Sequence, residues 1–295
     1  MHKIIHKIRK NYFLIIPILI VALIYIFSNL STYLHSYDNY SIDNMVVHYI
    51  DVGQGDCILV QVNNKNLLID SGPSSSKNKL MKYLKEIKLS TIDYVIATHP
   101  HEDHIGNMNR IIDSFDITNF YAPKVSDTSK SFEDMVYSLK KKNLKINIIK
   151  RGTDNIDLGN NTNVSVFSPI NDSYDNLNNY SPVIKIEYGS TSFLFTGDAE
   201  KEVEQDIVNH HDDISADVLK IGHHGSSTST SSNFLKAVKP SAAVISVGKN
   251  NVYNHPNKET LDRLTQNNAS IYRTDIDKNI LLISNGNTIK KLSIS

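Results

Sequence analysis

The stretch Thr98–Asn107, THPHEDHIGN, follows directly on the apolar run IDYVIA at residues 92–97. It places three histidines and two acidic side chains within ten residues, immediately after a segment whose composition predicts a buried strand. Neutral imidazoles and carboxylates are the ligands that zinc and similar divalent ions take in proteins. The stretch therefore predicts a metal centre at the end of a sheet strand.

The spacing HxHxDH divides these side chains into two groups. In an extended chain, alternate side chains point to the same side, so His99 and His101 are expected to serve one ion. Asp103 and His104 then fall on a different side of the turn and can serve a second ion. Gly106 permits a tight bend directly after them. A hydrated polar loop has no need of so many ligand-type side chains, and we interpret the stretch as metal-binding.

Two later segments repeat the order of an apolar strand followed by a ligand-type side chain. SFLFTGD ends in Asp198, and DVLKIGHHG contains His223 and His224. Two ions in one site need a shared anionic ligand to offset their repulsion, and Asp198 can bridge them. Alone, an aspartate after glycine is more often a helix cap, so the prediction depends on the HxHxDH motif in the same chain.

The remaining pattern predicts an α/β domain. Apolar runs such as VVHYI at 46–50, CILVQV at 57–62 and NLLID at 66–70 predict strands, and LMKYLKEIKL at 80–89 has helical spacing. Further helices are expected at 131–142, 200–210, 233–238 and 258–266, and a terminal hairpin about Asn285-Gly286. Because strands and helices alternate without a strict βαβ rhythm, the fold class is α/β with mixed sheets.

The order of these motifs resembles the metallo-β-lactamase superfamily of αββα sandwiches. Within it, the sequence is similar to the exported hydrolase domain of ComEC-type competence proteins and their free-standing relatives. The resemblance runs from about His48 to Pro256 and rests on six blocks: YIDVGQGDCILV, LLIDSG, ATHPHEDHIGN, LFTGDAE, LKIGHHGSSTSTS and ISVGKNNVYNHP. It implies that residues 45–295 form one metallo-β-lactamase-fold hydrolase domain.

The resemblance implies two divalent metal ions, Zn²⁺ first and Mn²⁺ as the alternative. It assigns His99 and His101 to the first ion and Asp103 and His104 to the second, with Asp198 bridging them. One of His223 or His224 completes the second site. Strand geometry favours His223 as the ligand and His224 as a neighbour that contacts substrate. Asp70 in LLIDSG supports the ligand loop from behind.

The first metal position departs from the family pattern. Many members have a further histidine before the Gly-Asp motif, but NDSYDNLNNYS at 171–181 contains none. The branch tends to carry an Asn-Asn-x-Ser element here, matched by Asn178, Asn179 and Ser181. The first site then takes only His99, His101 and Asp198 from the protein, so we expect it to be partly occupied.

Other polar residues near these motifs leave alternatives open. His255 in GKNNVYNHP can be a general acid, a donor to a substrate oxyanion, or a loop histidine before Pro256. Lys220 can face substrate or cover a sheet face, and snorkelling is the commoner behaviour of lysine. His210 and His211 end a predicted helix, which accounts for them without a role in the site.

The predicted reaction is hydrolysis by a metal-bound hydroxide, with phosphodiester bonds as the target. Asp103 orients the hydroxide or takes its proton, which makes it catalytic together with His224 and His255. The resemblance implies a nuclease-like enzyme acting on DNA. The alternative is a hydrolase of small phosphodiesters or esters on cell-envelope polymers, similar to a phosphocholine esterase. A second alternative is a non-catalytic, metal-bound binding or scaffold protein.

The N-terminal segment predicts a membrane anchor. Basic residues at positions 3, 7, 9 and 10 precede Tyr12–Phe27, sixteen residues without a charge, and residues 28–30 extend this run. A spanning helix needs about twenty residues, and no small-x-small cleavage site follows. We expect residues 1–30 to be a cytoplasmic flank and a single-pass transmembrane helix, residues 31–44 a linker, and the domain to lie outside the cytoplasm. Secretion after cleavage is the alternative.

The charge balance limits the partners. Beyond the basic flank, 27 basic side chains stand against 31 acidic ones, which argues against nucleic-acid binding through a broad basic surface but allows a local cationic site. The single cysteine, Cys57, is expected to be a small buried hydrophobe. The expected partners are the membrane, a DNA or envelope-polymer substrate, and a membrane channel, because one span forms no channel. The sequence gives no evidence of a protein partner.

Overall fold

The computed structural model describes residues 44–292 together with Pro17, Ile20 and Val21. Apart from these three residues, the expected transmembrane helix lies outside the described residues, and so does nearly all of the linker. In the part of the chain that is described, no helix has the length and apolar character needed to cross a membrane.

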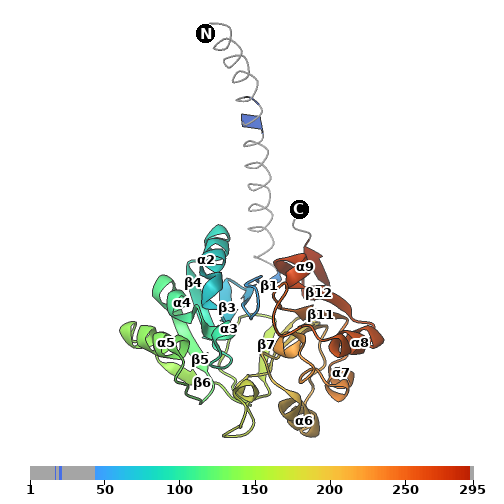
Figure 1. Ribbon diagram of the computed structural model, residues 1–295. Coiled ribbons are helices and arrows are strands. Elements are labelled where there is room, and N and C mark those ends of the chain that lie inside the picture. Colours follow the sequence, from blue (N-terminus) through green and yellow to red (C-terminus); the bar gives the residue numbers. More distant parts are fainter. Residues whose placement is uncertain (1–16, 18–19, 22–43, 293–295) are drawn as a thin grey trace.

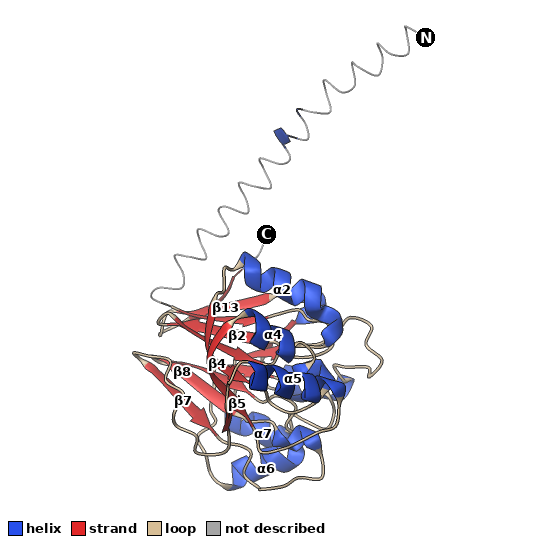
Figure 2. Ribbon diagram, turned by 90° about the vertical axis from the view of Figure 1, so that its left-hand side faces the viewer, coloured by secondary structure: helices blue, strands red, loops and turns tan. Residues whose placement is uncertain are grey.

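Two mixed β-sheets form the centre of the domain. The larger sheet has the strand order β14-β13-β1-β2-β3-β4-β5-β6, and the smaller one has the order β12-β11-β10-β9-β8-β7. Helices cover the outer side of each sheet, so the layers run helix, sheet, sheet, helix (Figures 1 and 2). The predicted αββα sandwich is confirmed.

The element bounds agree with most of the predicted segments. The strands are β1 Met45–Tyr49, β2 Ile58–Val62, β3 Lys65–Ile69, β4 Thr91–Ile96, β5 Asp116–Ala122, β6 Ile146–Ile148, β7 Thr162–Val166, β8 Ile184–Tyr188, β9 Thr191–Phe195, β10 Val218–Lys220, β11 Ala242–Ile245, β12 Ser270–Arg273, β13 Ile280–Ser284 and β14 Ile289–Leu292. The α-helices are α2 Lys77–Glu86, α3 Glu102–Ile105, α4 Met108–Ser114, α5 Lys130–Lys141, α6 Lys201–Asn209, α7 Ser232–Val238, α8 Lys258–Gln266 and α9 Thr274–Asp277. Short 3₁₀ turns lie at Ser74–Ser76, Leu177–Tyr180 and Gly222–Gly225.

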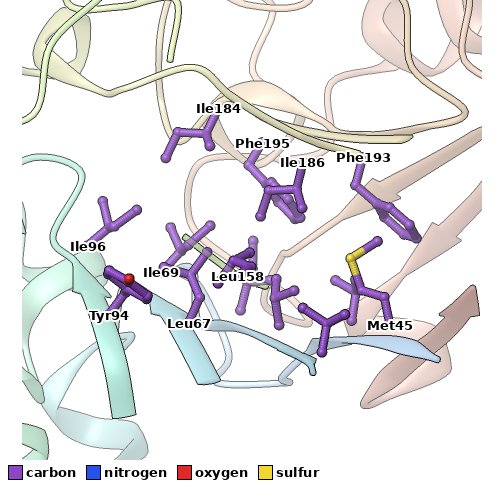
Figure 3. Packing of buried hydrophobic residues seen from close by; sticks show 14 of the residues in the cluster. Met45, Leu67, Ile69, Tyr94, Ile96, Leu158, Ile184, Ile186, Phe193 and Phe195 are labelled. Carbon is purple, nitrogen blue, oxygen red and sulfur yellow. The ribbon is translucent and has the colours of Figure 1, made fainter. Parts of the chain in front are cut away.

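The main core lies between the two sheets (Figure 3). In β1, Met45, Val47 and Tyr49 point into this core and are fully buried. On the facing sheet, Phe193 and Phe195 of β9 contribute to the same cluster. Because strand side chains alternate between faces, every second residue of these apolar strands reaches the space between the sheets.

The other faces of the sheets are buried beneath the helices. In α2, Leu80, Tyr83 and Leu84 follow the spacing i, i+3, i+4 and pack against outward-facing residues of the larger sheet such as Leu59. A third cluster joins α6, α7 and α8 to the smaller sheet. Both sheets are therefore covered on two sides, which explains why inner strands such as β1 and β9 are buried along almost their whole length.

The strand directions decide where the polar motifs meet. Strands β3, β4, β5 and β6 are parallel to one another, and so are β9, β10, β11 and β12. The carboxyl ends of parallel strands lie at one edge of a sheet, which is where α/β proteins place their ligands. Asp70 follows β3, His99 follows β4, Asp198 follows β9 and His224 follows β10, so four distant segments converge there.

Candidate metal centre

The HxHxDH motif runs from the end of β4 into the short helix α3. His99 and His104 are buried, while His101 and Asp103 are partly exposed. His99 Nε2 lies 3.0 Å from His101 Nδ1, and their ring centroids are 4.7 Å apart. The two imidazoles therefore face the same point, as the extended spacing predicts.

Asp70 holds this loop from behind. Its carboxylate accepts hydrogen bonds from the Thr98 backbone N–H at 2.8 Å and the Thr98 hydroxyl at 2.7 Å. The same carboxylate lies 2.8 Å from His104 Nδ1. A proton on Nδ1 that is donated to Asp70 leaves Nε2 of His104 as a lone-pair donor toward the centre, the usual arrangement behind a metal-ligating histidine.

Asp198 lies in the middle of the histidines. Its Oδ2 atom is 3.2 Å from His104 Nε2, 3.5 Å from His224 Nε2, 3.7 Å from His223 Nε2 and 4.0 Å from His99 Nε2. The backbone N–H of Asp198 donates to the Ser181 hydroxyl at 3.1 Å, which fixes the start of the loop. One carboxylate oxygen directed at the imidazoles of both motifs has the geometry required of a bridging ligand.

The two neighbouring histidines lie in positions opposite to those expected. His224 is fully buried, and its Nε2 lies 3.2 Å from Asp103 Oδ2. His223 has a 24% exposed side chain, and its Nδ1 faces Glu200 at 3.2 Å and Thr228 at 3.3 Å. The structure thus favours His224 as the ligand and places His223 at the rim, against the preference for His223.

The backbone explains this exchange. His223 and His224 both have left-handed conformations, with φ of 49° and 53°. The chain therefore does not continue as an extended strand, on which the preference for His223 depended. His224 Nδ1 lies 2.9 Å from the Ser246 carbonyl, so an N–H there leaves Nε2 free to face Asp103.

These side chains fit a divalent cation. One ligand atom each from Asp103, His104, Asp198 and His224 lies within 4.8 Å of the others. Among the described residues, His104 Nε2, His224 Nε2 and Asp198 Oδ1 are buried side-chain atoms without a hydrogen-bond partner. Buried polar atoms without partners are rare, and a cation between them would satisfy all three.

The electrostatics also favour a cation. Burial alone would lower the pKa of His104, but Asp198 and Asp70 raise it well above its usual value. Burial also opposes the charged form of His224, and Asp198 with Asp103 raises its pKa to about 10. Asp198 is desolvated, yet His104 and His224 keep its pKa well below normal. Protons thus balance the carboxylates, and a metal ion would take their place and release them.

The first metal position has fewer protein ligands. His99, His101 and Asp198 surround it, and His99 Nδ1 lies 3.3 Å from the Ser181 hydroxyl. The segment 171–181 supplies no histidine. Instead Asn179 Oδ1 accepts from the Glu200 backbone N–H at 3.1 Å and so braces the loop after β9. Partial occupancy of this position stays a prediction.

Lys220 and Asp56 form a buried pair that the sequence patterns do not predict. Lys220 Nζ lies 2.5 Å from Asp56 Oδ2, and both side chains are essentially inaccessible to solvent. The expectation that Lys220 snorkels along a sheet face is wrong, because β10 is an interior strand and turns this side chain into the protein. Asp56 Oδ1 also lies 3.4 Å from His224 Nδ1, so the pair borders the centre.

His255 lies beside the centre rather than in it. Its ring centroid is 5.6 Å from that of His223. Burial, together with the neighbouring His223 and His224, lowers its pKa to about 4. His210, in contrast, points its Nδ1 at the Asp206 carbonyl near the end of α6, as expected for a helix C-terminus.

An αββα sandwich with histidine and aspartate side chains at the strand ends defines a class of metal-dependent hydrolases. The model of the metallo-beta-lactamase superfamily matches residues 50–249, and the chain belongs to that superfamily.

The curated relatives that the chain resembles include competence proteins, as the sequence motifs indicate. ComE operon protein 3 of Bacillus subtilis (strain 168) is 32% identical over 247 residues, which cover 78% of this chain and 32% of the relative. Competence protein ComA of Neisseria gonorrhoeae is 26% identical over 230 residues, which cover 77% of this chain and 30% of ComA. The chain thus spans about a third of the length of these relatives.

Solved structures show the same fold at low sequence identity. The metallo-beta-lactamase fold protein YhfI from Bacillus subtilis superposes with a TM-score of 0.55 at 15% identity, covering 82% of this chain and all of that one. CmlA, a diiron beta-hydroxylase from Streptomyces venezuelae, superposes with a TM-score of 0.54 at 13% identity. The match covers 85% of this chain and 54% of CmlA. These likenesses concern the fold alone.

Proposed function

We propose that this protein hydrolyses phosphodiester bonds with two divalent ions, Zn²⁺ or Mn²⁺, at the carboxyl ends of its strands. The single observation that carries the proposal is the Asp198 carboxylate. One of its oxygens faces four histidine nitrogens at 3.2 to 4.0 Å, and its other oxygen has no hydrogen-bond partner among the described residues. The proposed ligands are His99, His101, Asp103, His104, Asp198 and His224.

When bound, the ions would lower the pKa of a water molecule and stabilise charge on the attacked phosphoryl group. The protein fixes the ligands for this chemistry in advance. Asp70 orients His104, and the Ser246 carbonyl orients His224. Because these partners hold the rings in place, little reorganisation is needed when substrate binds.

Asp103 suits a ligand better than a proton acceptor. Burial would raise the pKa of Asp103, but His104 and His224 lower it far below its usual value. A carboxylate with so low a pKa is a weak base and stays ionised. Its side chain is nevertheless 31% exposed, so it can accept a hydrogen bond from an incoming water.

His255 suits a hydrogen-bond donor better than a general acid. With a pKa of about 4, its ring is neutral near pH 7 and lacks the acidic proton of the imidazolium form that a general acid would donate. A neutral imidazole still carries one N–H. We assign it to a substrate oxygen next to the metal ions, in the manner of an oxyanion donor.

The proposed substrate, the location of the domain and its partners all follow from the same proposal. The relatives include competence proteins, which supports a nucleic acid as substrate. We place the domain, residues 45–295, outside the cytoplasm behind a single-pass anchor in residues 1–30. A membrane channel is the partner that we propose for it.

The test compares Asp198→Asn with the exposed control Asp172→Asn in the full chain. Hydrolysis of bis-p-nitrophenyl phosphate and bound metal per chain are measured with Zn²⁺ or Mn²⁺ added. Losing a residue behind the ligands typically costs 10- to 100-fold in activity, so losing Asp198 should cost more than about 100-fold, with normal circular dichroism. Activity that survives Asp198→Asn refutes the two-ion site. Tight metal binding without hydrolysis by the wild type would support a binding protein instead.

A further inference from the structure

A cleft of about 720 Å³ lies next to the metal centre. The loop 248–256 forms one wall, and Arg273 with the following α9 segment to Lys278 forms the other. His255 lines the cleft, and its ring centroid is 5.6 Å from that of His223. The cleft therefore begins one side chain away from the rim of the centre.

The walls of the cleft are positively charged, although basic and acidic residues balance over the whole chain. Lys249, Arg273 and Lys278 line it together with a single acid, Asp275. Arg273 is paired with Asp275 at 2.7 Å. The structure shows no ion pair for Lys249 or Lys278 within residues 44–292. Two uncompensated ammonium groups thus remain beside a phosphodiesterase centre.

An aromatic ring that does not itself line the cleft lies on the same loop and contacts the lining residue His255. Tyr253 is 63% exposed, and its ring stacks on His255 with centroids 5.7 Å apart and an angle of 27° between the planes. An exposed tyrosine beside a cationic cleft is the arrangement that proteins use to bind single-stranded nucleic acids, because every base offers a face for stacking.

Asn251 holds the loop that carries Tyr253. Its side-chain amide donates to the carbonyls of Gly248 at 2.9 Å and His255 at 2.6 Å. Its oxygen accepts from the backbone N–H groups of Tyr253 at 3.1 Å and His255 at 3.0 Å. Four hydrogen bonds from one side chain fix the loop before any ligand arrives, which lowers the entropic cost of binding.

We propose that this cleft binds the nucleotide next to the scissile bond of a single-stranded nucleic acid. Lys249 and Lys278 neutralise its phosphate, and Tyr253 stacks on its base. The inference rests on the proposed phosphodiesterase function and narrows its substrate. A small diester has no second phosphate for Lys249 and Lys278 to contact, and an envelope polymer without bases has nothing to stack on Tyr253.

The experiment uses full-length Tyr253→Ala and the double variant Lys249→Ala/Lys278→Ala. Exposed Lys82 and Lys85 on α2 give a control, Lys82→Ala/Lys85→Ala, with the same change in net charge. Each protein is assayed on a single-stranded oligodeoxynucleotide, on poly(glycerol phosphate) and on bis-p-nitrophenyl phosphate. Binding of the oligonucleotide is measured in parallel by fluorescence anisotropy with chelator present.

Tyr253→Ala should raise the KM and Kd for the oligonucleotide about tenfold, since a stacked base contributes roughly 5- to 150-fold in affinity. The lysine variant should flatten the slope of log Kd against log salt by about 0.7, the change for one lost phosphate contact on a single strand. The control variant should leave both quantities unchanged. All variants should hydrolyse bis-p-nitrophenyl phosphate as the wild type does.

The two proposals fail separately. Wild-type hydrolysis of the small diester, with KM, Kd and salt slope for DNA unaltered in the cleft variants, overturns the cleft assignment alone. Preference of the wild type for poly(glycerol phosphate), unaffected by Tyr253→Ala, overturns the nucleic acid as ligand. Absence of any hydrolysis overturns the proposed reaction, and the anisotropy measurements then still decide whether the cleft binds a single strand.

Discussion

Lys220→Met should destabilise the protein strongly, although it changes a lysine to a residue of similar length within an apolar strand. Lys220 and Asp56 are buried, and 2.5 Å separate Nζ from Oδ2. Methionine fills most of the same space but leaves the Asp56 carboxylate without its cation. The large effect is therefore expected from the orphaned charge and not from a cavity.

The magnitude follows from the burial of both groups. At an effective dielectric constant of about 20, two unit charges at this separation attract by about 7 kcal/mol before desolvation is counted. Desolvation offsets part of this attraction, and removing one member of a buried pair typically costs about 3–5 kcal/mol. For a domain of this size, each kcal/mol of lost unfolding free energy lowers the melting temperature by about 2–4 °C. The melting temperature should therefore fall by roughly 6–20 °C.

The assay is urea unfolding at pH 7, followed by circular dichroism, for the wild type, Lys220→Met and Asp56→Asn/Lys220→Met. The double variant removes both charges, and exchanging a whole buried pair is often nearly neutral. It should therefore recover most of the free energy of unfolding that the single variant loses. Bound metal is measured alongside, because Asp56 also faces His224 at 3.4 Å.

Two results would refute this reasoning. A loss below about 1 kcal/mol in Lys220→Met would be typical of an exposed ion pair and would mean that water reaches Asp56. A double variant no more stable than the single one would show that the lysine contributes through packing and not by compensating the carboxylate.

Two further predictions concern the histidines. His224→Ala should lower the affinity for Zn²⁺ more than about tenfold, while His223→Ala at the rim should lower it less. Isothermal titration calorimetry measures both affinities. An equal loss in the two variants would contradict the assignment of His224. Burial lowers the pKa of His48 from 6.5 to about 3, so its contribution to stability is present above pH 6.5 and is lost as the pH falls from 6.5 toward 3. Between pH 6.5 and 5 this loss is about 2 kcal/mol, and His48→Gln should remove it from the pH dependence of unfolding; an unaltered dependence would show that His48 is not the group responsible.

Secondary structure was predictable where the apolar period was strong. The helices expected at 131–142, 200–210, 233–238 and 258–266 correspond to α5, α6, α7 and α8 within a residue at each end. The hairpin about Asn285-Gly286 joins β13 and β14, and Gly286 has the positive φ of 83° that such a turn needs. Local patterns suffice for these elements because each one buries a single continuous face.

The strand β5, Asp116–Ala122, was missed. Its first four residues, Asp-Ile-Thr-Asn, alternate between exposed and partly buried positions, and its apolar run is too short to stand out. It becomes a strand because β4 on one side and β6 on the other supply parallel hydrogen-bonding partners. Such pairing depends on residues distant in the sequence, which local propensity does not report.

The sequence by itself determined the chemistry of this protein, because ligand type and local spacing are written in the chain: His-x-His-x-Asp-His after a strand already indicates divalent metal ions. Tertiary structure alone decided which groups face one another. Through left-handed backbone conformations it brought His224, and not His223, into the buried group with Asp103, His104 and Asp198, and it joined Lys220 to Asp56 across two sheets. Spacing fixes direction only within one regular element, whereas contacts between elements follow from how the sheets pack and where their strands end.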